Sequence, residues 1–462
     1  MIFTATLKEP NMTIIAPFRG LTYSPDLFDQ LPNLTAPPYD VISPEEQEGY
    51  YQKNPFNVIR LILGKKKTGD SDWDNPYTRA ADLFRRWQSQ GILRQADQPC
   101  MYVTALDYDP GNGEPRRTRW GVIAAVKIEE PDSGVILPHE KTFSAHKDDR
   151  LRLMRACGAQ FSQIFGLYED AENRVKGALN RVVERAPVLD FPFHDGTNHR
   201  MWEVDDPAVF RSISDTLADK RIFIADGHHR YETARNYRNL MRTRYGQQSP
   251  GRSYEYVMMY LSNMSDEGLT ILPSHRLIKR VPGFDLDRFL ERSSAWFEIE
   301  PVSLPKTPSD AEYMELRDSL AEAGRVTSAF ALVLHGDERV FLFTLKPGAR
   351  KEMGDDLHDS LKKLDVLVLS RLAFQKGMGF SREDLDNPEL FFYQSGFRKA
   401  ANDVRQGRYQ LGFLLNPTRM EHVKEVAGNA LVMPRKSTFF FPKVLTGLVF
   451  NKLDPDDVIT VP

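Results

Sequence analysis

The sequence predicts a mixed α/β protein built from two lobes. Its 462 residues exceed the ~250–300 at which a single hydrophobic core usually stops growing, so two packed lobes are expected. Hydrophobic residues make up 41% of the chain, which is enough for a sizeable core. Short β-prone runs alternate with segments of helical spacing, as in α/β lobes. We place the boundary at Pro282–Gly283, which gives lobes of residues 1–282 and 283–462.

The first lobe begins with a polar loop that leads into a helix. Ser43 precedes Pro44 and Glu46, which is the arrangement of a helix N-cap with proline and an acid in the first turn. Tyr39 and Asp40 are therefore expected on the loop before this helix.

The remaining elements follow from hydrophobic periodicity and turn residues. In the first lobe we predict a buried strand at 57–63, a helix at 77–90, a hairpin at 101–130, a strand at 161–168, a helix at 171–186, and strands at 221–226, 256–264 and 269–278. In the second we predict a helix at 284–297, a hairpin at 327–345, a helix at 357–374, and short strands near 409–415 and 431–443. Apolar residues recur at helical spacing after the 221–226 strand, at Tyr231, Ala234, Tyr237 and Met241.

Charge and cysteine content narrow the class of protein. Lys and Arg total 61 against 64 Asp and Glu, and the net charge of -3 argues against a dedicated nucleic-acid binder. Cys100 and Cys157 are too few for a disulfide scaffold, which fits a reducing compartment. The first residues lack a basic leader, and no apolar run reaches the ~18 residues of a membrane span. We expect a cytoplasmic protein without a membrane partner.

The stretch IADGHHRYETARN, residues 224–236, carries the densest group of chemically active side chains. A helix start presents amide N–H groups without intrahelical partners and a positive dipole end, so it readily binds an anion. Gly227 permits the backbone to approach the anion closely, and Arg230 can bind a phosphate bidentately. His228 and His229 add hydrogen-bond donors. Beside an anion, Asp226 is a candidate magnesium ligand or a candidate base.

Two other interpretations of this stretch remain open. Asp-Gly before a helix is often only a turn, and adjacent histidines are often polar surface. A zinc site is less favoured, because zinc usually takes three or four protein ligands and the other histidines lack the required spacing.

A second polar cluster follows the predicted strand before residue 139. It contains His139 and Glu140, then Lys147 and Arg150. Glu140 is a candidate general base, and the two cations are candidates to neutralise phosphate. The alternative is a solvated loop that leads into a helix.

Other phosphate and catalytic motifs are absent from the sequence. The segment around Gly64-Lys65 has Ile59 where a P-loop has its first glycine. There is also no G-x-S-x-G elbow and no kinase H-R-D set. Any nucleotide chemistry must use a different phosphate cradle.

The motif IADGHHRYETA resembles the signature of a prokaryotic family, domain of unknown function 1015, within the ParB/sulfiredoxin-like group. Further blocks that resemble the family are IAPFRGL at 15–21, APPYDVISPEEQ at 36–47, NPFNVIRLIL at 54–63, HEKT at 139–142, KDDRL at 147–151 and MPRKSTFFFPKVLTGLV at 433–449. The resemblance covers nearly the whole chain. It departs from the expected pattern at Ala145-His146 and at Gln163, where we expect a Gly-Pro-like turn and a proline.

This resemblance implies a ParB/sulfiredoxin-like first lobe whose glycine-containing helix start holds nucleotide phosphates. Sulfiredoxins use a cysteine in this turn, whereas this chain has His228, so reductase chemistry is not expected. Free-serine kinases of the group share a D-G-H-H-R-type turn, which maps to Asp226 through Arg230, and an upstream glutamate base, which maps to Glu140.

Two functional hypotheses follow from these observations. The first is a kinase of free L-serine or a similar hydroxyl metabolite that uses ATP or ADP, or CTP, with Mg²⁺. The expected catalytic residues of this kinase are Glu140, Asp226 and His228, and its expected metal ligand is Asp226. The residues expected to bind phosphate are Gly227, His229, Arg230, Lys147 and Arg150. The residues expected to bind the substrate are Tyr39, Asp40 and His139. The second is a ParB-like regulator that is gated by nucleotide and engages DNA or protein through the arginine-rich helix after residue 228.

Overall fold

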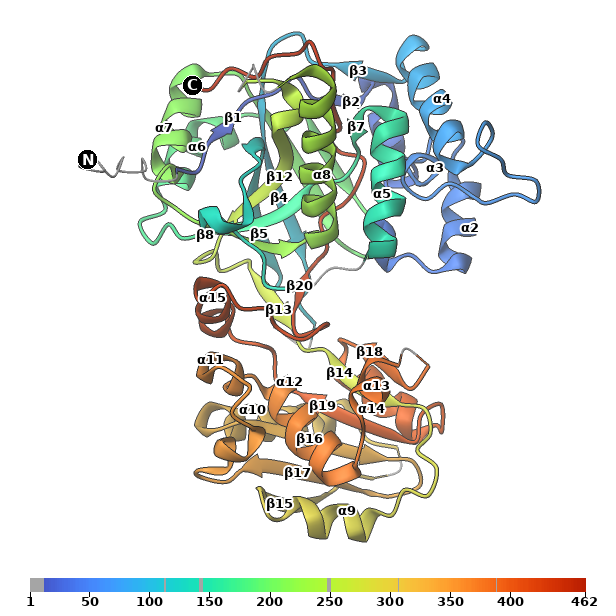
Figure 1. Cartoon of the computed structure of the whole chain (residues 1–462), viewed down its shortest axis with the longest axis vertical. Coiled ribbons are helices and arrows are strands. Elements are labelled where there is room, and N and C mark those ends of the chain that lie inside the picture. Colours follow the sequence, from blue (N-terminus) through green and yellow to red (C-terminus); the bar gives the residue numbers. More distant parts are fainter. Residues whose placement is uncertain (1–11, 112–113, 141–143, 247–250, 306, 388) are drawn as a thin grey trace, which may run out of the picture. The chain divides into compact units, whose positions relative to one another are not determined.

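The chain folds into two compact units (Figure 1). The computed structural model describes residues 12–111, 114–140, 144–246, 251–305, 307–387 and 389–462, without the side chains of residues 144–146. The first unit comprises Met1–Pro138, Thr142–Leu269 and Pro442–Pro462, and the second comprises His139–Lys141 and Thr270–Phe441. Both contain helices and sheets, which confirms the predicted mixed α/β class.

A nine-stranded sheet forms the centre of the first unit. Its strands run in the order β6 (Ile136–Leu137), β11 (Ile222–Asp226), β8 (Ile164–Tyr168), β12 (Tyr256–Asn263), β5 (Arg117–Lys127), β4 (Met101–Tyr108), β10 (Asn198–Val204) and β9 (Leu189–Pro192), with β1 (Ile15–Ala16) also paired to β5. β11 pairs antiparallel with β8, and β8 pairs parallel with β12. The predicted hairpin is confirmed as β4 and β5.

The first unit also contains helices, and some of them pack their apolar faces against this sheet. The helices are α1 (Leu31–Leu34), α2 (Pro44–Lys53), α3 (Ile59–Ile62), α4 (Pro76–Ser89), α5 (Ser144–Cys157), α6 (Arg174–Val183), α7 (Pro207–Leu217) and α8 (His228–Tyr245). The core joins the sheet to α6, α7 and α8, and α8 packs beside α5. Ser43 caps α2 in a reciprocal capping box with Glu46, as the sequence predicts.

The second unit is built on a six-stranded sheet in which all neighbouring strands are antiparallel. The order is β15 (Phe297–Ser303), β17 (Arg339–Leu345), β16 (Ala329–Leu334), β19 (Leu411–Leu415), β14 (His275–Ile278) and β18 (Phe391–Gln394). A separate pair joins β13 (Thr270–Leu272) to β20 (Phe439–Phe441). The predicted hairpin at 327–345 is confirmed as β16 and β17.

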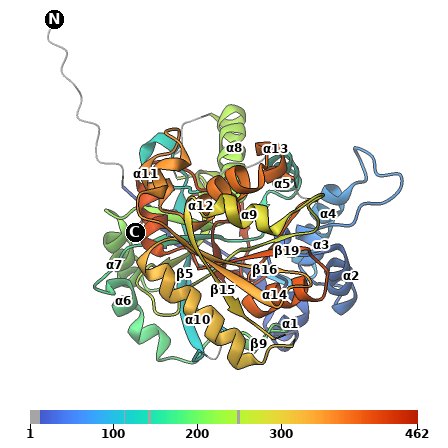
Figure 2. The same ribbon diagram turned by 90° about the horizontal axis from the view of Figure 1, so that it is seen from below.

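Helices lie on both faces of the six-stranded sheet, and each face has its own apolar cluster. The helices are α9 (Leu286–Ser293), α10 (Asp310–Val326), α11 (Asp359–Lys362), α12 (Asp365–Val368), a π-helix at Leu369–Met378, α13 (Arg382–Asp386), α14 (Phe397–Arg405) and α15 (Met420–Gly428). Figure 2 shows α10 and α14 on one side of the sheet and α9 and α12 on the other. No helix in the described part of the chain is long and apolar enough to cross a membrane.

The units divide the chain at positions other than the predicted Pro282–Gly283 boundary, which lies inside the second unit. The last segment, from Pro442 onward, returns to the first unit. There Phe450 exchanges backbone hydrogen bonds with Leu21, and Thr446 does so with Ala36. Local composition does not predict that the segment from Pro442 onward packs on the first unit, because its hydrogen bonds join residues near opposite ends of the sequence.

The predicted strand at 57–63 is wrong, because this segment forms the short helix α3. Asn57 is fully buried, and its side-chain oxygen accepts the Ile59 N–H at 2.8 Å. Its amide nitrogen donates to the Asn33 carbonyl at 2.7 Å. A short apolar run has no periodicity that separates strand from helix, and here the asparagine turns the backbone into a helix.

Candidate functional site

The strand-to-helix turn predicted from the sequence is present between β11 and α8. Asp226 is the last residue of β11, Gly227 has a φ of 95°, and His228 begins α8. The left-handed conformation suits glycine, since other residues rarely adopt it. Tyr231 and Ala234 on the apolar face of α8 are buried in the core of the sheet. The position of the turn is thus fixed by the strand β11 before it and by the packed helix α8 after it.

Asp226 lies between two cations in this turn. Its carboxylate forms an ion pair with Arg230 at 2.6 Å and with Lys443 at 2.5 Å, and its side chain is only 15% exposed. Burial raises the pKa of Asp226, but the charges of Lys443 and Arg230 outweigh burial and hold this pKa well below its usual range. The carboxylate is therefore ionised at neutral pH and is a weak proton acceptor.

Arg230 links the turn to the neighbouring strand. Its Nη1 donates to the Gln163 carbonyl, so the guanidinium bridges α8 and the segment before β8. The Gln163 side chain is buried, and neither of its polar atoms has a hydrogen-bond partner among the described residues. The Thr233 hydroxyl, one turn further along α8, is also buried without a partner there. Native proteins rarely leave such groups unsatisfied unless a water or ligand completes them.

A small cavity of about 50 Å³ lies next to Arg230 and Thr233. Tyr39 and Arg150 form part of its wall. The Arg150 guanidinium lies over the Tyr39 ring at 4.1 Å from its centroid and donates to the Ile62 carbonyl at 2.6 Å. Burial, together with the charge of Asp40, raises the pKa of Tyr39, although Arg150 and Arg230 oppose the shift. The cavity thus combines two guanidinium groups with a protonated phenol.

The other predicted residues of the first unit lie around this turn in different settings. Lys147 of α5 forms an ion pair with Glu232 at 2.8 Å. His228 is buried on the first turn of α8, and its charge contributes to the lowered pKa of Asp226. His229 is half-buried on the same turn, whereas Asp40 is exposed.

His139 and Glu140 belong to the second unit, whereas Asp226 belongs to the first. His139 is buried, and its Nε2 is 3.3 Å from the Thr438 hydroxyl. Its carbonyl accepts the Met433 N–H at 2.8 Å, and Glu140 forms a parallel bridge with Met433. Two sequence blocks, at 139–142 and 433–449, therefore meet in this unit through their described residues.

Sequence reasoning did not assign a role to three residues at the turn, namely Lys443, Gln163 and Thr233. Lys443 lies in the block at 433–449. Gln163 is the residue that departs from an expected proline. The place of Lys443 in this block and the departure at Gln163 are signals in the sequence, but no local pattern shows the contact between Asp226 and Lys443, which spans 217 positions.

The described residues contain no group of three or more His, Cys, Asp or Glu side chains that is arranged to hold a metal ion. A magnesium ion bound through a nucleotide needs fewer protein ligands, since Mg²⁺ usually takes one or two carboxylates together with phosphates and water. A single carboxylate such as Asp226 fits that donor set.

Comparison with solved structures finds distant similarities. A free serine kinase in complex with AMP is 14% identical with a TM-score of 0.32, covering 73% of this chain and 91% of that chain. A conserved hypothetical protein from Pyrococcus furiosus is 14% identical with a TM-score of 0.31, covering 74% and 95%. SbnI from Staphylococcus aureus, truncated at its C-terminus, is 10% identical with a TM-score of 0.33, covering 72% and 90%.

The family comparison is more extensive. No curated protein matches the chain. The model of a family described as "Protein of unknown function (DUF1015)" matches residues 15–367, which include the β11–α8 turn and most of both units. The assignment to the broader ParB/sulfiredoxin-like group stays a prediction. The chain belongs to the DUF1015 family.

Proposed function

We propose that the protein is a nucleotide-dependent phosphotransferase that acts on a small hydroxyl-bearing metabolite, with free L-serine as the favoured acceptor and ATP or ADP as the donor. The observation that carries the proposal is the cationic turn between β11 and α8. Arg230 and Lys443 meet there at a glycine-containing helix start, next to a cavity that Arg150 also lines. Helix starts of this kind bind phosphate through amide N–H groups and the dipole.

The unsatisfied polar groups support a ligand at this turn. The Thr233 hydroxyl faces no protein partner among the described residues and belongs to the cavity wall. A volume of about 50 Å³ accommodates the terminal group of a ligand and not a whole nucleotide. The nucleotide would therefore place one phosphate group at the cavity, and its remaining parts would lie outside.

Phosphoryl transfer needs mainly positioning and charge neutralisation from the protein. In the proposal, Arg230 and Arg150 bind phosphate oxygens, and Lys443 offsets the charge of Asp226 until the ligand arrives. Mg²⁺ would supply further neutralisation of phosphate charge when bound. The lowered pKa of Asp226 makes this carboxylate better suited to a metal or a cation than to proton abstraction. The role of Glu140 as the base stays a prediction, which the Glu140→Gln variant tests.

Two arginines of α8 are not available to the alternative of a DNA-binding regulator. Arg238 is buried and donates to the Ile128 carbonyl at 2.7 Å. Arg242 donates to the Glu255 carboxylate at 2.8 Å. These arginines serve the fold and do not form a free basic face.

The test is incubation of the purified chain with ATP or ADP, Mg²⁺ and a panel of hydroxyl metabolites that includes L-serine, with ³¹P NMR and mass spectrometry of the products. We expect a phosphorylated acceptor. Arg230→Ala should weaken nucleotide binding by about tenfold to a hundredfold, because a charge-assisted hydrogen bond to phosphate is lost.

Arg244→Ala is the matched control, since Arg244 lies at the exposed C-terminal end of α8 and should leave nucleotide binding unchanged. Bound nucleotide without any phosphorylated acceptor would overturn phosphotransfer. Equal nucleotide binding by the Arg230 and Arg244 variants would remove the turn as the binding site.

A further inference from the structure

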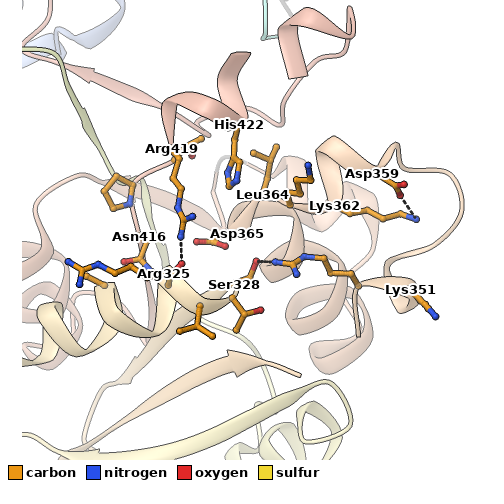
Figure 3. Close-up of a pocket in the computed structure, with 18 residues that line it drawn as sticks. Arg325, Ser328, Lys351, Asp359, Lys362, Leu364, Asp365, Asn416, Arg419 and His422 are labelled. Atoms are coloured by element: carbon orange, nitrogen blue, oxygen red, sulfur yellow. Dashed lines mark hydrogen bonds and ion pairs between the residues drawn. The ribbon is translucent and has the colours of Figure 1, made fainter. Parts of the chain in front are cut away.

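The second unit contains a larger cavity that is separate from the residues of the proposed phosphoryl transfer (Figure 3). Its volume is about 600 Å³, which lies in the range of sites for small metabolites. β16 and β19 are antiparallel, so the start of β16 and the end of β19 lie at the same edge of the sheet. The cavity opens at this edge, between the C-terminal end of α10, the helices α11 and α12, and the start of α15.

Positive charge is concentrated in this cavity. Six cationic side chains line it against two carboxylates, although the chain as a whole has a net charge of -3. The cations are Arg325, Arg350, Lys351, Lys362, Lys363 and Arg419, and the carboxylates are Asp359 and Asp365. A concave surface of one sign focuses the electrostatic field and attracts a ligand of the opposite sign.

Several of these cations retain unused hydrogen-bonding capacity. Arg350 donates from Nη2 to the Ser328 hydroxyl at 3.0 Å, whereas its Nη1 makes no hydrogen bond with the described residues. Within the same residues, Arg325 and Lys351 form no ion pair. Lys362 and Asp359 are 3.7 Å apart, which is a loose pair. A guanidinium with a free donor is well suited to a phosphate oxygen.

Polar side chains at the centre of the cavity can bind a part of the ligand that is either an uncharged polar group or a cation. Figure 3 shows Asp365 between Arg419, His422 and Ser328, with Asn416 on the side of Arg419. Burial raises the pKa of Asp365 to about 6, and a hydrogen bond from Ser328 and the charge of Arg419 oppose this shift. A carboxylate placed here accepts hydrogen bonds from a hydroxyl or an ammonium group.

We propose that this cavity binds a small phosphorylated metabolite, with the phosphate held by Arg350 and Arg419 and a hydroxyl or amino group held by Asp365 and Asn416. The binding site is independent of the phosphotransfer proposed above. In this proposal the ligand of the second unit is a phosphate monoester.

The test is isothermal titration calorimetry of the full chain with glycerol 3-phosphate, inorganic phosphate and malonate at constant ionic strength. The chain carries Arg230→Gln throughout, so that phosphate binding at the turn of the first unit is weakened in every measurement. We expect glycerol 3-phosphate to bind more tightly than inorganic phosphate, because its carbon-bound hydroxyl groups can reach Asp365 while its phosphate contacts the arginines. Malonate should bind most weakly. Equal or tighter binding of malonate would overturn the assignment to phosphate esters.

Substitutions in the cavity locate the binding. Arg350→Gln and Arg419→Gln should each weaken glycerol 3-phosphate binding at least about tenfold, as expected for a lost charge-assisted contact. Arg398→Gln is the matched control, because Arg398 is exposed on α14, pairs with Asp310 and does not line the cavity. Binding that is unchanged in both cavity variants, or absent in the parent chain, would overturn the proposal.

A second variant keeps the test decisive if the arginine variants fold poorly. Asp365→Asn removes a negative charge from the cavity and should tighten the binding of inorganic phosphate, which has no need of the carboxylate. The same substitution should reduce the preference for glycerol 3-phosphate over inorganic phosphate. Circular dichroism checks that this variant remains folded. If the folded variant binds inorganic phosphate more weakly, the proposed electrostatic effect of Asp365 is contradicted.

Discussion

Asp226 connects the sequence motif to the rest of the first unit. Its pair with Arg230 is an i,i+4 contact that the motif contains, whereas its pair with Lys443 comes from the distant end of the chain. All three side chains are largely shielded from water, with exposed fractions of 11–16%. Each charge in such a group depends on the others, because an unpaired charge is costly where water is excluded.

We therefore expect Asp226→Ala to lower the free energy of unfolding by about 3 kcal/mol, because two cations would face each other without a carboxylate. Urea denaturation followed by circular dichroism measures the effect. Glu172→Ala is the control, since Glu172 and Arg174 form an exposed pair and such pairs contribute only about 0–1 kcal/mol. Equal losses in the two variants would show that the Asp226 cluster is no more stabilising than a surface pair.

At the scale of elements, the sequence predicted those whose signals are local. Ser43 and Glu46 form the expected capping box, and the helix α8 begins directly after Gly227 as its apolar spacing requires. The sequence predicts one helix at 357–374, but the structure has α11, α12 and a π-helix in succession. Leu364, between α11 and α12, has an extended backbone that ends the first helix, and its side chain is buried in the core. Tertiary packing there overrides helical spacing.

Gly227 provides a prediction at this scale. Gly227→Ala should lower the free energy of unfolding by about 1–2 kcal/mol, because alanine at a φ of 95° is strained and its Cβ would lie 3.0 Å from the Arg230 guanidinium. Thermal and urea unfolding measure this change. The control is Gly177→Ala in α6, where the added Cβ would have no atom within 4 Å other than those of its own helix backbone, and helix propensity should stabilise the chain by up to about 1 kcal/mol. A stabilising Gly227→Ala would contradict the strained turn.

For the whole molecule, each unit contains a buried histidine that is kept neutral. Burial lowers the pKa of His199, in the first unit, to about 4. Burial and the charge of Arg276 lower the pKa of His275, in the second unit, to about 3. The His275 Nδ1 accepts the Leu415 N–H at 3.0 Å, which holds the neutral ring in the sheet.

Each of these two histidines should consequently reduce the stability of its own unit in mild acid. Below about pH 6.5 each histidine takes up a proton in the unfolded chain but not in the folded chain. Each histidine therefore lowers the free energy of unfolding by about 1.4 kcal/mol for every pH unit by which the pH falls from about 6.5 toward the pKa of the folded state. Calorimetry at pH 7.5 and pH 5 measures the loss. His275→Asn should reduce the pH dependence of the second unit alone, and His199→Asn that of the first. A pH dependence identical to that of the parent chain in both variants would contradict this origin.

The sequence by itself determined the mixed α/β class, the turn from Asp226 to Arg230 and the helix that follows, because periodicity, capping and glycine act over a few residues. Only the tertiary structure decided that Lys443 completes the charge cluster at this turn and that His139 lies against the segment near Met433. It also assembled the cationic cavity of the second unit from residues between Ala321 and His422. These arrangements depend on which distant segments the cores bring together, and short-range patterns do not encode that choice.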